Sequence, residues 1–494
     1  MRQALLRLGV IVITLFLFSS CERAEHKRVI TDSQPQKDSI FVPPIPQDII
    51  AQQKDLKIKL YIENSGSMIG YVNGPTQLKD MLQNLLVDLK YFYDEENIEI
   101  YFINSKIHAS SIKSGVVNFA NKLSISSIQK AGTKKDRATS DLNNIFKQIT
   151  SETEDNSISI LLSDFIYSIE PGETVNRLGE QQALTKNVFL TADKDGQKLT
   201  TNVYQYFSDY DGKYYDLNDD DKPQKGQRPY YLAVIGEQNN IKQFTKSIGP
   251  KFNNYKGYSN EYLLTAEDFE VKDFTVLTST LNNGRIKPIR GTDINGQIRQ
   301  IEVEESGRGD TPFQLAIAVD LSSLAITDNY ITDIANYELY NKDWALFKIG
   351  KIAGDDIIFS NGKKLSISKA DQPHVQFGAT HVFIFKSSDV NNKSLSFNLK
   401  RNMPQWVTDS SLLDDTDLTI NEIKQKKTFG LDYLINGISS AYLQATKKES
   451  YFNINISIEK PKSSSFPGQV IGFIFLLLLI ALIVRIILKR KTRK

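Results

Sequence analysis

The chain has 494 residues, of which 40% are hydrophobic and 24% are charged. This length exceeds one ordinary domain and this balance is typical of globular proteins, so two or three folded units are expected. The 60 basic and 58 acidic side chains leave a formal net charge of +2, which lacks the basic surface of a nucleic-acid-binding protein and excludes that class.

Residues 1–21 are predicted to be a signal peptide of the lipoprotein type. Arg2 and Arg7 precede an apolar stretch at 8–18 that is short for a membrane span, and Cys21 follows two serines as the only cysteine. This pattern resembles a bacterial lipoprotein signal, with Cys21 as the lipidated residue, although its Phe18 departs from the usual aliphatic residue. The alternatives are an ordinary signal, or an uncleaved anchor with an incidental cysteine.

Residues 22–53 are rich in proline and polar residues and are predicted to be a linker. An α/β domain is predicted at 54–258, because segments of strand-like and helix-like periodicity alternate there. The expected strands are 56–62, 98–103, 158–162 and 231–235, and the expected helices are 76–93 and 142–149. This order favours a Rossmann-like, mostly parallel sheet with helices on both faces.

A hairpin insertion is expected at about 180–228, where Asp-Gly turns separate tyrosine-rich segments. Its acidic stretch 216–221 lacks the glycine and the distal glutamate of a calcium loop, which favours a solvated turn. Residues 259–460 contain short strand-like segments between turn residues, and they are predicted to form one or two β-sandwich units with one helix at about 431–444.

Residues 470–488 are almost wholly apolar and are predicted to be a transmembrane helix. Arg485 can extend its charge toward the headgroups, and the basic tail 489–494 is expected on the cytoplasmic side. The predicted localisation is a bacterial membrane, crossed once, with residues 22–465 outside the cytoplasm.

Oxygen-bearing side chains are expected where the α/β strands end. The first strand leads into Glu63, Ser65 and Ser67, the strand at 158–162 leads into Asp164, and Thr139 precedes a predicted helix. In an open parallel sheet, ligands bind beyond the carboxyl ends of the strands. Hydroxyl and carboxylate oxygens are the ligands that Mg²⁺, Mn²⁺ and Ca²⁺ prefer.

Two segments carry a resemblance to a known family. Residues 60–68, Leu-Tyr-Ile-Glu-Asn-Ser-Gly-Ser-Met, resemble the start of a von Willebrand factor A (vWA) domain, whose metal-ion-dependent adhesion site opens with Asp-x-Ser-x-Ser. Residues 160–164 resemble the strand that supplies the distal aspartate of that site. The resemblance covers about residues 54–255. It implies that Ser65, Ser67 and Thr139 (or, in its place, Thr133) contact the metal through hydroxyls, and that Glu63 and Asp164 act directly or through water.

Glu63 departs from the family, which has aspartate at this position. Its side chain is one methylene longer, and a Mg²⁺ site tolerates misplaced ligands poorly. Glu63 is therefore expected either to bind through a different arrangement of water or to belong to a metal-free, structural site. In the second case Ser65 and Ser67 serve in loop and helix capping.

The resemblance implies a non-catalytic envelope protein that captures a protein partner through the bound cation. One alternative is an envelope metal-dependent hydrolase, but none of the four histidines lies in the candidate loops and no nucleophile-elbow pattern is present. The other is a signalling or assembly subunit that is coupled to a second membrane protein.

Overall fold

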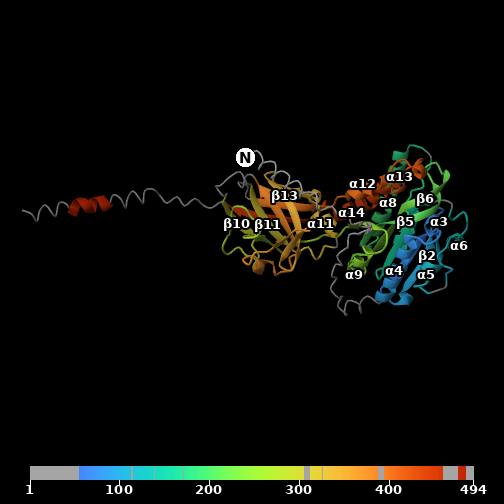
Figure 1. Ribbon diagram of the computed structural model, residues 1–494, viewed down its shortest axis with the longest axis horizontal. Coiled ribbons are helices and arrows are strands. Elements are labelled where there is room, and N and C mark those ends of the chain that lie inside the picture. Colours follow the sequence, from blue (N-terminus) through green and yellow to red (C-terminus); the bar gives the residue numbers. More distant parts are fainter. Residues whose placement is uncertain are drawn as a thin grey trace, which may run out of the picture. The chain divides into compact units, whose positions relative to one another are not determined.

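The fold is given by a computed structural model of the chain (Figure 1). The structure describes residues 55–112, 115–137, 140–170, 172–304, 312–324, 326–387, 394–459 and 477–485. The predicted signal peptide 1–21, with Cys21, and the predicted linker 22–53 lie outside the described residues, and no finding supports them.

The first half of the described chain forms a seven-stranded mixed sheet. Its strands are β1 (Lys57–Glu63), β2 (Ile98–Ile103), β3 (Ile107–Ala109), β4 (Ser157–Ser163), β5 (Leu199–Tyr215), β6 (Asp221–Glu237) and β7 (Tyr258–Thr265). Their order is β3-β2-β1-β4-β6-β5-β7. Strand β1 is parallel to β2 and β4, and every other neighbouring pair is antiparallel.

The predicted mostly parallel, Rossmann-like sheet is therefore wrong. Strands β5 and β6 form one long hairpin that is paired from end to end, and the two strands of a hairpin are necessarily antiparallel. Residues 231–235 belong to the returning strand β6, which also pairs antiparallel with β4. The segment expected as an insertion, about 180–228, contains most of helix α8 and most of this hairpin.

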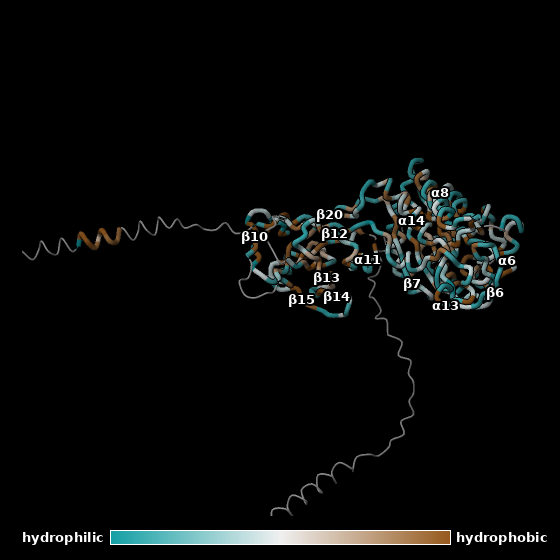
Figure 2. Tube along the Cα trace, turned by 90° about the horizontal axis from the view of Figure 1, so that it is seen from above, coloured by the Kyte–Doolittle hydropathy of each residue, from teal (hydrophilic) through white to brown (hydrophobic). Residues whose placement is uncertain are grey.

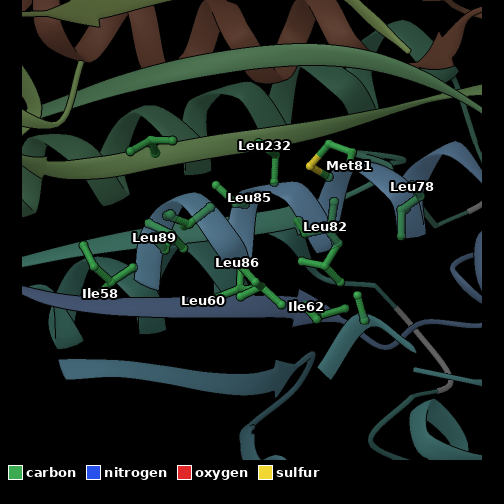
Figure 3. Packing of buried hydrophobic residues seen from close by; sticks show 14 of the residues in the cluster. Ile58, Leu60, Ile62, Leu78, Met81, Leu82, Leu85, Leu86, Leu89 and Leu232 are labelled. Carbon is green, nitrogen blue, oxygen red and sulfur yellow. The ribbon is translucent and has the colours of Figure 1, made fainter. Parts of the chain in front are cut away.

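Helices cover both faces of the sheet. The helices of this part are α3 (Ile69–Val72), α4 (Gln77–Phe92), η1 (Glu95–Asn97), α5 (Phe119–Lys122), α6 (Ile125–Lys130), α7 (Leu142–Glu152), α8 (Thr174–Lys194), α9 (Gln238–Ser247) and α10 (Gly249–Phe252). Figure 3 shows leucines of α4 packed against the sheet, with Leu86 beside Leu60 of β1. Tyr61 belongs to a different core, because successive side chains of a strand point to opposite faces.

Helix α4 confirms the helix predicted at about 76–93, and its first turn is capped by Thr76. The Thr76 hydroxyl accepts a hydrogen bond from the Lys79 amide at 3.4 Å and donates one to the Tyr71 carbonyl at 2.6 Å. Replacing Thr76 by alanine is expected to lower the free energy of unfolding by about 1 kcal/mol in urea denaturation. The matched variant Thr76→Ser keeps the hydroxyl, and its free energy of unfolding should fall clearly less. An equal fall in both variants would contradict the capping role.

The second half of the described chain forms two sheets that enclose one core. One sheet has the order β12-β17-β20-β10-β9 and the other the order β15-β14-β13-β16-β11-β8. Their strands are β8 (Phe274–Leu277), β9 (Arg285–Pro288), β10 (Gln300–Glu304), β11 (Phe313–Val319), β12 (Tyr337–Leu339), β13 (Trp344–Ala353), β14 (Asp356–Phe359), β15 (Lys364–Ser366), β16 (His381–Ser387), β17 (Ser394–Lys400) and β20 (Ser450–Glu459). Three short helices accompany them, α11 (Asp328–Thr332), η2 (Ile334–Asn336) and η3 (Gln372–Val375). Phe383 of one sheet and Phe397 of the other share this core.

Between β17 and β20 the chain returns to the seven-stranded sheet, to the core that contains Tyr61. This segment contains α12 (Gln405–Asp409), β18 (Ser411–Leu412), η4 (Leu418–Ile420), α13 (Glu422–Gln425), β19 (Thr428–Phe429) and α14 (Leu431–Thr446). Leu434 of α14 is buried together with Phe146 of α7 and Leu178 of α8, and α14 lies along α8 in the ribbon (Figure 1). Helix α14 therefore completes the layer on one face of the seven-stranded sheet.

The predicted membrane span at 470–488 is contradicted, as is the localisation that follows from it. Of these residues the structure describes 477–485, a helix that is hydrophobic except for Arg485 (Figure 2). No helix of the described part of the chain combines the length and the apolar character that crossing a membrane requires.

Candidate functional site

Two acidic side chains lie side by side at the ends of neighbouring strands. Glu63 ends β1, and Asp164 directly follows β4, which is the parallel neighbour of β1. Both carboxyl groups are buried, with 0% of Glu63 and 1% of Asp164 exposed. The parallel register of β1 and β4 brings these two residues together.

Serine hydroxyls bind both oxygens of Glu63. The Ser140 hydroxyl donates to Oε1 at 2.6 Å, and the Ser163 hydroxyl donates to Oε2. The hydroxyls of Ser65 and Ser67, in the loop after β1, bond to one another at 3.0 Å. The long side chain of Glu63 thus bonds Ser140 and Ser163 directly.

Asp164 is less well satisfied than Glu63. Its Oδ1 accepts a hydrogen bond from the Ile166 amide at 3.4 Å. Its Oδ2 is buried and has no hydrogen-bond partner among the residues that the structure describes. A buried carboxylate oxygen without a partner is costly unless a nearby positive charge compensates it.

Burial raises the pKa of both carboxyl groups. For Glu63, burial and the neighbouring Asp164 raise the pKa to about 7, against the opposite effect of the serine hydroxyls around it. For Asp164, burial raises the pKa, while the nearby Ser67 hydroxyl and the Arg228 guanidinium act to lower it. One proton on this pair is therefore retained near neutral pH, because two adjacent buried carboxylates repel each other.

The far end of the β5–β6 hairpin covers the site. Strand β5 pairs with β7 only as far as Tyr206, whereas its pairing with β6 continues to Tyr215. Residues 207–230, the overhang of the hairpin, lie against the loop after β1. A Cβ atom added to Gly66 would stand 2.9 Å from the Tyr215 ring, and one added to Gly70 would stand 2.4 Å from the Tyr210 ring.

Residues of the returning segment also bond to this overhang. Asp415 accepts hydrogen bonds from the Tyr214 hydroxyl at 2.6 Å and from the Leu217 amide at 2.9 Å. At the tip, Asp216 accepts bonds from two amides of the turn and pairs with Lys222 at 2.5 Å. This contact set is that of an ordinary turn, in agreement with the expectation for 216–221.

Of the sequence-predicted site residues, the structure brings together Glu63, Ser65, Ser67 and Asp164. Thr139 lies outside the described residues. The alternative threonine, Thr133, bonds Asp136 within its own turn. Sequence reasoning missed Ser140 and Ser163, although each adjoins a predicted site residue. It also missed Arg228, for which the sequence holds no signal.

The residues of the site do not fit a bound cation. Both Glu63 oxygens and the two loop hydroxyls already have partners, which leaves Asp164 Oδ2 as the one carboxylate oxygen of the pair without a hydrogen bond. Within the described ranges, no group of three or more histidine, cysteine, aspartate or glutamate side chains could hold a metal ion. This finding contradicts the expectation of a metal-binding group. The prediction of Mg²⁺, Mn²⁺ or Ca²⁺ held jointly by carboxylates and hydroxyls stays a prediction, because Thr139 lies outside the described residues.

An open groove lies beside the buried pair, between α7 and α8. It has a volume of about 540 Å³ and is lined by Asp141, Asn143, Asn144, Lys147, Ser168, Ile169, Glu170, Gln181, Leu184, Asn187 and Val188. The groove and the buried pair are linked by Ser140, whose amide donates to the Ser168 hydroxyl at 3.4 Å and whose own hydroxyl binds Glu63.

The chain matches no protein-family model, and no curated protein and no solved structure is similar to it. The resemblance of residues 60–68 and 160–164 to the vWA family stays a prediction for those segments. The sheet into which they fold is not the mostly parallel one that the resemblance implies.

Proposed function

We propose that this chain is a non-catalytic binding protein, and that it holds an extended segment of a protein partner in the groove between α7 and α8. The observation that carries this proposal is the lining of the groove, in which four amide side chains and three aliphatic ones surround a cavity of about 540 Å³. Side-chain amides both donate and accept hydrogen bonds, which suits the backbone of an extended peptide.

The floor of the groove is held in place by hydrogen bonds. The Asn143 amide donates to Gln181 at 2.6 Å, and the Thr185 hydroxyl donates to Asn143 at 2.5 Å. Thr185 also bonds the Tyr167 hydroxyl at 2.7 Å. A floor fixed in this way loses little conformational entropy when a partner binds, which favours affinity.

The rim of the groove offers both apolar and charged contacts. Leu184 is 52% exposed on α8, and an apolar side chain of a partner can be buried against it. Asp141 and Glu170 contribute two negative charges and Lys147 one positive charge. A partner segment with a basic residue therefore complements the net charge of the lining.

The buried pair supports a binding role in preference to acid–base chemistry at this groove. Glu63 and Asp164 are buried beneath the hairpin overhang, so a ligand in the groove meets the Ser140 and Ser168 region and not the two carboxyl groups. A general acid or base must lie within hydrogen-bond reach of the group on which it acts.

Site-specific photo-cross-linking in the native host tests this proposal. A photoreactive phenylalanine at Leu184 is expected to give one discrete adduct with a partner protein. The same residue at Tyr91, which is 71% exposed on α4 across the sheet, should not give that adduct. In a second arm, Asn187→Arg fills the groove and should lower the adduct yield about tenfold, as a loss of about 1.4 kcal/mol in binding would.

The matched control for Asn187→Arg is Ala183→Arg, which places the same charge on an exposed residue of α8 that does not line the groove. It should leave the yield unchanged. Equal adducts from Leu184 and Tyr91, or equal yields from both arginine variants, would rule out the groove as the docking site.

A further inference from the structure

We propose that Arg228 supplies the positive charge that a metal ion would otherwise bring to the Glu63–Asp164 pair, so that the site works without a metal. The charge would then belong to the hairpin overhang itself. This inference goes beyond partner binding, because it concerns what holds the covered end of the sheet together.

Arg228 is enclosed in the overhang. It pairs with Ser208 across the hairpin and is only 1% exposed. Its Nη1 donates to the Gln425 carbonyl at 3.2 Å, and its guanidinium lies 4.5 Å from the centre of the Tyr214 ring. Its Nε and Nη2 are buried and have no hydrogen-bond partner within the part of the chain that is described.

A buried guanidinium with two unpartnered nitrogens is expensive unless negative charge lies nearby. Asp164 is a negative charge on the neighbouring strand: β4 and β6 pair as far as Ser163 and Tyr231, so Asp164 directly follows the last paired residue of β4 and Arg228 precedes that of β6 by three residues. No ion pair within 4.0 Å joins the two side chains, and Asp164 Oδ2 is also buried without a partner among the described residues. The influence is mutual: the charge of Arg228 acts to lower the pKa of Asp164. Burial acts to lower the pKa of Arg228, but the surrounding tyrosines, Tyr214 first, and to a smaller extent Asp164 outweigh it and leave that pKa above its usual range.

The covering of the site agrees with an internal cation. A metal that captures a partner needs an unfilled coordination position at the surface. Here Tyr215 lies over Gly66 and Tyr210 over Gly70, and Ser67 is buried. A cation carried by the overhang needs no such opening, and it couples closure of the overhang to the charge of Asp164.

The first test is a metal titration of the intact purified chain. With about 10 mM MgCl₂ or MnCl₂, the Tm is expected to stay within about 1 °C of its value in EDTA, since a bound metal would stabilise the folded state. A rise of several degrees that Asp164→Asn abolishes would overturn the proposal.

The second test is a double-mutant cycle between Arg228 and Asp164. Arg228→Met should lower the Tm, because it leaves Asp164 buried without a compensating charge. Asp164→Asn should restore part of that loss, so the double variant should lose less than the sum of the two single variants. Losses that simply add would overturn the proposal. Should Arg228→Met not fold, the metal titration decides alone, because its result on the intact chain needs no variant at Arg228.

Discussion

Replacing Glu63 by glutamine is expected to remove much of the dependence of this protein's stability on pH. The ordinary pKa of a glutamate side chain is 4.5, and burial raises that of Glu63 to about 7. Between these values the unfolded chain has released the proton while the folded chain retains it, so stability is full below about pH 4.5 and is lost as the pH rises through about 7. The loss is on the order of 3 kcal/mol.

Glutamine is neutral at every pH in this window and can still bond the hydroxyls of Ser140 and Ser163, because a hydroxyl both donates and accepts. Urea denaturation at pH 5, 6, 7 and 8 should show the wild-type free energy of unfolding falling with pH and that of Glu63→Gln falling much less. Asp164, whose pKa is also raised, leaves a residual slope of the same sign.

The matched control is Glu96→Gln, at an exposed glutamate just before β2. Its free energy of unfolding should fall with pH as much as that of the wild type does across the four pH values. A Glu63→Gln curve that is also parallel to the wild type would show that Glu63 is ionised in the folded state, contrary to its burial.

Replacing Gly212 by alanine is expected to lift the hairpin overhang from the sheet. A Cβ atom at this position would stand 2.6 Å from the Cα atom of Gly70, which is a backbone atom and cannot rotate away. Overpacking of this kind costs about 1–3 kcal/mol. Because the overhang carries exposed Lys213 and Lys225, trypsin should cleave the variant there several-fold faster than the wild type.

The control for this experiment is Gly179→Ala on α8, where an added Cβ atom meets no neighbour within 4 Å. It should stabilise the chain by up to about 1 kcal/mol and leave the cleavage rate at the overhang unchanged. If Gly212→Ala were as stable as the wild type and were cleaved at the same rate, the overhang would not pack closely on the loop after β1.

Local patterns in the sequence were sufficient to predict α4 and the strands that end at Glu63 and Asp164. They could also predict that these two side chains meet, since neighbouring parallel strands end at one edge of a sheet. They could not reveal that β6 is the returning arm of a hairpin, because the same hydrophobic residues 231–235 suit a parallel or an antiparallel neighbour. The role of Arg228 was equally hidden, since burial of an arginine depends on distant partners such as Tyr214 and Gln425.

The prediction of a bound cation rests on a pattern that two different arrangements share. Ser65 and Ser67 have the spacing of a cation site, but the sequence does not show whether their hydroxyls bond an ion or each other. In the structure Ser65 and Ser67 bond one another, and the Glu63 carboxylate accepts hydrogen bonds from Ser140 and Ser163. The prediction of a membrane span at 470–488 likewise rests on hydropathy alone.

The return of α14 to the first sheet has a consequence for synthesis and for any attempt to shorten the chain. A ribosome releases β1 to β7 long before it releases residues 431–446, so the nascent α/β layer emerges with the α8 side that α14 later covers facing water. The β-rich part must be made while that layer is unfinished, and the two cores are nested in the chain, not consecutive. A fragment cut after residue 265 would therefore expose an apolar helix face, and fragments for expression should run through α14.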